Sequence, residues 1–254
     1  MTRLFGLIIS LIAASVLTTV PSAASSRLVA DLSNKSIAIT TGFHGTELLL
    51  FGAVDGRAGD DIIVIVTGPP TDIAQRRKDN RAGIWVNVET NIWKQAPSFY
   101  NILATRPLDK IASIEMRKQL GIGPAHLGLT LLPEGGTGPA IDGNRFIEAL
   151  AGNMGSIHLW PAQTGTVSLA QDALFRTTLD LPANIVTGDY DIRVLHFRDG
   201  MAISEDRTRL NIEKGGLTAD IYNLAHDYSA LYGIFAIAFA VAAGWLAAAA
   251  FRRN

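Results

Sequence analysis

Uninterrupted apolar runs lie at both ends of the chain, with a patterned sequence between them. The first run, Leu4–Val20, follows the single cation Arg3 and ends at Pro21 and three small residues. A short charged start, an apolar stretch and small residues at the end are the signature of a secretory signal. The pattern therefore predicts a signal peptide over residues 1–24 that is cleaved on export, with an uncleaved anchor as the alternative.

The second run covers residues 231–251 and contains no charged residue. As a helix it would be about 31 Å long, which matches the hydrocarbon thickness of a bilayer. Arg252 and Arg253 follow it, whereas acidic residues precede it. Because cationic flanks stay in the cytoplasm, the sequence predicts a transmembrane helix with residues 252–254 inside. The chain would thus sit in a bacterial inner membrane, in contact with the lipid bilayer, with its body in the periplasm.

The region 25–106 has the pattern of a β domain. Residues alternate between apolar and polar, or form short apolar runs bounded by Gly and Pro. The run Ile62–Val66 is typical of a strand buried on both faces. Six short strands with this punctuation predict an immunoglobulin-like sandwich. They are expected at 28–32, 35–40, 47–51, 62–66, 83–88 and 98–104.

Residues 107–156 predict a helical and loop connection. The apolar positions of 108–120 recur on one helical face, which indicates a helix. A second helix is expected over 142–154, with Asp142 as its cap. The intervening residues, 121–138, are rich in Gly and Pro and predict a loop with one short strand at 127–132.

A second β block covers 157–214. The order Gly188-x-Tyr190 at a strand start resembles the tyrosine corner of immunoglobulin-like sandwiches, in which the hydroxyl binds a neighbouring loop. The segment Arg198–Met201 contains Asp-Gly and predicts a hairpin turn. The body is therefore expected to be mainly β and to form two sandwiches, with a single elaborated sandwich as the alternative. Residues 215–230 are expected to form a juxtamembrane helix.

Composition narrows the function classes. The chain has 254 residues, of which 48% are apolar and 18% charged, with a formal net charge of −1 and no cysteine. The absence of cysteine excludes disulfides and thiolate metal sites. The predicted exported part carries more acidic than basic residues, which argues against nucleic acid as a partner.

The sequence offers no readable catalytic constellation. Its five histidines are scattered without metal-ligand spacing, and no Gly-x-Ser-x-Gly motif is present. His196 lies at an inward strand position and is expected to be a core histidine. We therefore expect no enzyme activity, no catalytic residue, no metal site and no cofactor.

One cluster is a candidate binding site: Arg76, Arg77, Lys78, Arg81 and Trp85. Arginine forks bind oxyanions through two parallel hydrogen bonds, and a tryptophan can form an adjacent wall. The cluster is predicted to lie on a loop and to bind a small oxyanion or an acidic protein. The alternative is a solvated connection with its tryptophans in the core.

Small residues recur every four positions in the predicted membrane helix, at Ala236, Ala240, Gly244 and Ala248. Such a stripe allows a second helix to approach closely. The helix is rich in alanine, so a lone helix with no partner is the alternative.

An ordered set of short motifs runs through the chain. It comprises Arg76-Arg77-Lys78, Gly83–Asn87, Pro97–Tyr100, Thr105–Pro107, Leu174–Arg176, Leu181–Asn184, Gly188-x-Tyr190, Phe197–Gly200, Leu231–Gly233, Gly244-Trp245 and Phe251–Arg253. This set resembles an alphaproteobacterial family of transmembrane proteins. The resemblance implies a signal peptide, a β-rich periplasmic body and one C-terminal helix, and it supplies no catalytic residues.

Members of that family often occur beside sulfite-exporter-like permeases. The resemblance thus implies an interaction or accessory component of a sulfite- or sulfonate-exporter-like transporter. A periplasmic binding module for a small oxyanion, using the Arg76–Arg81 segment, is the alternative function.

Overall fold

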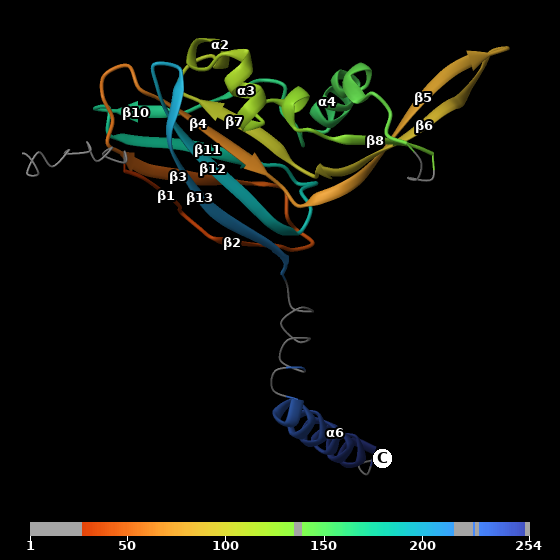
Figure 1. Cartoon of the computed structure of the whole chain (residues 1–254). Coiled ribbons are helices and arrows are strands. Elements are labelled where there is room, and N and C mark those ends of the chain that lie inside the picture. Colours follow the sequence, from red (N-terminus) through yellow and green to blue (C-terminus); the bar gives the residue numbers. More distant parts are fainter. Residues whose placement is uncertain (1–26, 135–138, 216–225, 227–228, 252–254) are drawn as a thin grey trace, which may run out of the picture.

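The computed structural model describes residues 27–134, 139–215, 226 and 229–251 (Figure 1). The predicted signal peptide, the cytoplasmic tail and most of the predicted juxtamembrane helix lie outside the described residues.

The described chain is mainly β, with short helices in its middle. Its strands are β1 (Leu28–Leu32), β2 (Ser36–Ile39), β3 (Thr46–Val54), β4 (Asp61–Thr67), β5 (Pro70–Arg81), β6 (Ile84–Pro97), β7 (Tyr100–Ala104), β8 (Thr130–Pro133), β9 (Gly165–Thr166), β10 (Ser168–Ala170), β11 (Leu174–Leu181), β12 (Gly188–Arg198) and β13 (Met201–Lys214). Its helices are α2 (Leu108–Ile111), α3 (Ile114–Leu120), η1 (Pro124–His126), η2 (Gly143–Arg145), α4 (Ile147–Ser156) and α6 (Ser229–Phe251).

The strands form three sheets. One has the order β1-β3-β11-β10, the second β2-β13-β12-β4-β7-β9 and the third β5-β6-β8. β3 pairs with β11 and β4 pairs with β12, so strands from both predicted β blocks share the first two sheets. The two predicted blocks therefore share sheets and do not form two separate sandwiches. A local sequence pattern predicts where a strand lies but not which strand it pairs with. The paired strands here are more than a hundred positions apart in the chain.

The core lies on both faces of the six-stranded sheet. In β4 every residue from Asp61 to Val66 is buried, as predicted for its apolar run. In β11 buried and exposed residues alternate, so the four-stranded sheet turns one face inward. In Figure 1, α2, α3 and α4 gather on the side of β4 and β7 that is remote from β3 and β11. β4 is thus covered by a sheet on one face and by helices on the other.

The predicted helix over 108–120 is two helices, which corrects that expectation. Ala112 adopts an extended conformation, and the Ser113 side chain accepts a hydrogen bond from the Met116 N–H to cap α3. A capping serine competes with a continuous helix because its oxygen satisfies the free N–H groups of a new first turn. The second predicted helix is confirmed as α4, with Asp142 capping the preceding η2 turn.

Two local predictions of the second block are confirmed. The Tyr190 hydroxyl donates to the carbonyl oxygen of Val186 at 2.7 Å, the contact of a tyrosine corner. The β12–β13 connection is a two-residue turn in which Asp199 and Gly200 have φ angles of 50° and 80°. Both angles lie in the left-handed region, as the primed turns of β-hairpins require.

The C-terminal apolar run forms the helix α6, and its described side chains are largely exposed, with Phe235 at 78% and Trp245 at 72%. Within the described residues, however, no helix combines the length and apolar character needed to cross a membrane. The helix is therefore confirmed, whereas its predicted crossing of the bilayer is not shown.

Candidate functional site

The predicted binding cluster lies on a long hairpin formed by β5 and β6. Ala82 and Gly83 link the strands with φ angles of 53° and 83°, and the Gly83 N–H donates to the side chain of Asn80 at 2.9 Å. The Arg76–Arg81 segment is therefore strand, not the loop that the sequence predicted. A run of polar residues suggested a loop, but this segment pairs in register with β6.

The outer part of this hairpin extends beyond the third strand of its sheet, although Arg76 and Arg77 at its inner end still line a pocket with Arg145 and Ala149. The third strand of its sheet, β8, pairs only with Asn91–Lys94 of β6. Residues 76–90 thus form a two-stranded ribbon, which we name the arm, and Figure 1 shows it projecting from the body. The β5 strand contributes six residues to the arm, so the arm is about 20 Å long.

The base of the arm is fixed by Trp93, which is 1% exposed. Its indole N–H donates to the Gln75 side-chain oxygen at 2.7 Å, and the Gln75 amide donates to the Phe146 carbonyl at 3.3 Å. The indole ring packs on Gly143, where an added Cβ would lie only 2.7 Å from it. The arm therefore projects from a rigid base formed by β6, η2 and α4.

The structure brings all five predicted site residues onto the arm. Cross-strand partners share a face of a two-stranded ribbon. Lys78 pairs with Asn87 and Asn80 pairs with Trp85, so Lys78 and Trp85 lie on one face. Arg81 pairs with Ile84 on the opposite face.

The cations of the arm differ in their partners. Arg77 forms an ion pair with Glu89 at 3.1 Å, and Arg81 lies 3.9 Å from Asp79. Hydrogen bonds from Asn91 and then from Arg77 hold the pKa of the Glu89 carboxyl below its usual value. Among the described residues, neither Arg76 nor Lys78 forms an ion pair, so both charges are available to a partner.

The tip of the arm is apolar and exposed. Trp85 is 68% exposed and Ile84 is 67% exposed. The alternative of tryptophans in the core thus holds for Trp93 but not for Trp85. The sequence interpretation missed Ile84, because the polar run before Ala82 and Gly83 carries no alternating pattern that would mark a hairpin with Ile84 at its tip.

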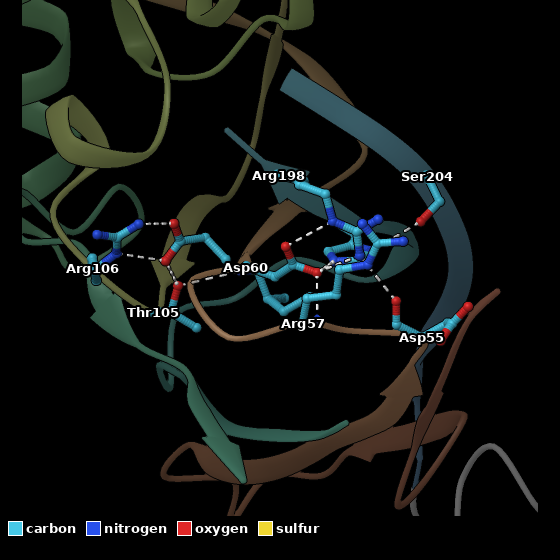
Figure 2. Close-up of polar contacts among 10 residues, drawn as sticks. Asp55, Arg57, Asp60, Thr105, Arg106, Arg198 and Ser204 are labelled. Carbon is cyan, nitrogen blue, oxygen red and sulfur yellow. Dashed lines mark hydrogen bonds and ion pairs between the residues drawn. The ribbon is translucent and has the colours of Figure 1, made fainter. Parts of the chain in front are cut away.

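A second cluster of charged side chains is buried where β4 begins (Figure 2). Asp60 accepts hydrogen bonds from the Arg198 Nε and Nη2 atoms at 2.9 and 2.7 Å and from the Arg57 N–H at 2.8 Å. His196 Nε2 lies 2.8 Å from the same carboxylate. The bond from Arg198, aided by those from Arg57 and His196, holds the pKa of Asp60 far below its usual value despite burial.

Ser204, His196 and Asp60 follow one another in the order of a catalytic relay, since Ser204 Oγ lies 3.5 Å from His196 Nδ1. The environment is that of a core contact. His196 is fully buried, as the sequence predicted. Arg198 also occupies the carboxylate that a relay would need to orient the histidine. This cluster therefore joins β12 to the loop before β4.

The neighbouring carboxylate, Asp61, also joins two segments of the fold. Asp61 accepts hydrogen bonds from the Thr105 hydroxyl at 2.7 Å and from Arg106 Nε at 2.8 Å, two residues that directly follow the adjacent strand β7 (Figure 2). In the described part of the chain, no three His, Asp or Glu side chains are arranged to hold a metal ion.

The predicted helix-packing stripe, Ala236, Ala240, Gly244 and Ala248, lies on α6 at a spacing of four and is exposed. Its packing against a second helix stays a prediction.

Fold and site together define a mainly β protein with a projecting arm and a C-terminal apolar helix. Residues 27–253 match the family described as Putative transmembrane protein (Alph_Pro_TM), and the chain belongs to this family. The resemblance drawn from its ordered motifs is thereby confirmed. No curated protein matches the chain. Family membership assigns no residue role, so the functional argument rests on the geometry of the arm.

Proposed function

We propose that the protein is an interaction component of the bacterial inner membrane. In this proposal α6 anchors the chain in the bilayer with its tail in the cytoplasm, and the body stands in the periplasm. The arm docks on a membrane protein with an acidic rim around an apolar recess. Membership of a family described as transmembrane, together with the uncharged length of α6, supports the anchor.

The observation that carries the proposal is the exposed tip of the arm. A two-stranded ribbon is marginally stable in water, and the tryptophan and isoleucine at its end leave most of their apolar surface exposed. Burial of each such side chain contributes about 1.5–3 kcal/mol. Tryptophan and arginine are also the residues that most often carry binding energy at protein interfaces.

The chemistry of the arm favours a protein over a lipid surface. Its cations are interspersed with Asp79 and Glu89 and with the amides of Asn80 and Asn87, which form directional hydrogen bonds. Both edges of the arm also present backbone groups that a partner strand can pair with. The unpaired Arg76 and Lys78 add the charge complementarity that an acidic partner would meet.

A transporter is the partner class that we favour, specifically a sulfite- or sulfonate-exporter-like permease. A periplasmic accessory protein with an apolar helix in the same membrane would meet such a permease without diffusing through the periplasm. We further propose that the protein is not an enzyme, because the buried Asp60 cluster is engaged in holding the fold.

Quantitative affinity capture tests this function. The full-length protein is captured from detergent-solubilised membranes and compared with Trp85→Ser and Lys78→Glu. We expect one membrane protein to be lost from both variants. It should be retained by two controls on the body, Leu174→Ser and Arg209→Glu, at an exposed leucine and an exposed arginine. A set of captured proteins that is identical for all four variants would overturn the proposal.

A further inference from the structure

A cavity of about 640 Å³ lies between β7 and the helical layer, and no residue of the arm lines it. Its volume is in the range of small-molecule sites. Tyr100, Ile102 and Trp160 line one side, and α3, η1 and α4 line the others. In Figure 1 these helices lie beside one another above β7.

Most of the wall is apolar, and the part formed by α4 is made of small residues. Ala151, Gly152 and Gly155 face the cavity from that helix. A Cβ added at Gly152 would meet no atom within 4 Å. The space in front of α4 is therefore open to an apolar group.

One charged side chain at the cavity has a buried donor atom without a hydrogen-bond partner. The Nε atom of Arg117 is buried and forms no hydrogen bond within the described residues. Its charge helps to hold the pKa of the Glu115 carboxyl below its usual value, after bonds from the Glu115 N–H and Ser113. Residues two positions apart do not face each other on a helix, and Arg117 forms no ion pair with Glu115 among the described contacts. A buried donor without an acceptor is destabilising, because it has lost its hydrogen bonds to water without replacement.

The wall around Arg117 is held firmly in place. The Tyr100 hydroxyl donates to the Gly121 carbonyl at 3.1 Å and accepts from the Gly123 N–H at 2.9 Å. Burial raises the pKa of Tyr100 to about 12, so this hydroxyl keeps its proton at neutral pH. Arg193 Nη1 donates to the carbonyl of Leu120 at 3.1 Å and fixes the end of α3. The cavity is thus formed without rearrangement.

From the open apolar space and the unpartnered arginine, we infer that this cavity binds a small organic anion, with its apolar body in the cavity and its carboxylate on Arg117. A carboxylate supplies the acceptor that the buried Nε lacks and can bind guanidinium through two parallel bonds. A second cavity of about 480 Å³ shares Leu108, Arg117 and Thr164 with the first. The charged end of the ligand lies where the two cavities meet. This site is separate from the arm and does not depend on the proposed docking.

Calorimetric titration of the full-length protein in lipid nanodiscs tests this site. The probes are 4-phenylbutyrate and its uncharged counterpart 4-phenyl-1-butanol, each titrated also into empty nanodiscs. We expect saturable binding of the acid that is about tenfold tighter than that of the alcohol, as a charge-assisted pair predicts. No saturable binding of 4-phenylbutyrate to the wild type would overturn the inference.

Three variants assign the binding to this cavity. Arg117→Met should weaken binding of the acid about tenfold and leave that of the alcohol unchanged, because only the charge is lost. Gly152→Leu fills the cavity and should abolish binding of both probes. Gly42→Leu is the matched control, since a Cβ there also meets nothing within 4 Å. If Arg117→Met does not fold, Arg117→Gln removes the same charge and is used in its place. Acid binding that survives both the Arg117 and the Gly152 variants would contradict the assignment.

Discussion

His196 Nε2 lies 2.8 Å from Asp60 Oδ2, although 136 positions separate the two residues in the chain. A carboxylate can only accept hydrogen bonds, so the Nε2 atom carries the proton and Nδ1 faces Ser204. The same carboxylate receives both nitrogens of the Arg198 fork. This contact fixes β12 to the segment that leads into β4, and it explains why a triad-like set of residues belongs to the core.

Replacing Asp60 by Asn should destabilise the protein. The change removes a charge that is buried against Arg198, and breaking such a pair from one side costs about 3 kcal/mol. Denaturant-induced unfolding followed by circular dichroism measures the loss. Asp180→Asn, at an exposed position of β11, is the control and should change the free energy of unfolding little. Equal effects of the two substitutions would contradict the role given to Asp60.

The same carboxylate should make stability depend on acid pH. Its pKa in the folded protein lies far below the unfolded value of about 4. Its contribution is therefore fully present above about pH 4 and is lost as the pH falls towards the folded pKa. We expect the free energies of unfolding of the wild type and Asp60→Asn to converge as the pH falls below about 4. Parallel curves would show that another group is responsible.

Two buried tyrosines should give the opposite dependence at alkaline pH. Burial raises the pKa of Tyr100 and of Tyr190 to about 12 in each case. Because the folded pKa exceeds the unfolded value of about 10, their contribution is present below pH 10 and is lost as the pH rises through 12. Ultraviolet absorbance of tyrosinate should show a late ionisation step from Tyr100 and Tyr190. Tyr100→Phe and Tyr190→Phe should each remove one late titration.

Gly143→Ala should loosen the base of the arm. The added methyl group would meet the Trp93 ring at 2.7 and 2.9 Å, and both the ring and the turn are packed. Overpacking of this kind costs about 1–3 kcal/mol. Gly42→Ala, with open space around it, should be neutral in the same unfolding measurement. A neutral Gly143→Ala would show that the indole ring is free to move.

Substitutions at the tip of the arm should leave stability unchanged. Trp85 and Ile84 contact no core residue across the ribbon, since their partners are Asn80 and Arg81. We expect Trp85→Ser to change the free energy of unfolding by less than about 0.5 kcal/mol, as for ordinary surface positions. A loss of several kcal/mol would mean that Trp85 serves the fold of the body and not a partner.

The sequence predicts the parts of this fold that depend on local pattern. The alternation in β11, the buried run of β4, the tyrosine corner and the Asp199-Gly200 turn all follow from neighbouring residues. The pairing of β3 with β11 does not, because it joins segments that carry no shared local signal. The division into two sandwiches failed for this reason.

The candidate sites likewise combine features that the local sequence predicts with features that only the fold creates. The sequence predicts the cations of the arm and Trp85 as candidate site residues. It does not predict the strand conformation of the cations, because their polar run has no strand pattern and forms a strand by pairing with β6. Arg117 carried no signal in the sequence. Its place at a cavity depends on the break between α2 and α3 and on the contact of those helices with β7.

The central claim is that the arm docks on an acidic membrane protein, and photocrosslinking in cells tests it most directly. Benzoylphenylalanine replaces Trp85, or Leu174 on the body as a control, and the adducts are identified by mass spectrometry. We predict one protein adduct from position 85, reduced by Lys78→Glu and restored when an acidic residue at the crosslinked site of the partner is changed to Lys. Adducts with lipid alone, or a protein adduct that Lys78→Glu leaves unchanged, would contradict the claim.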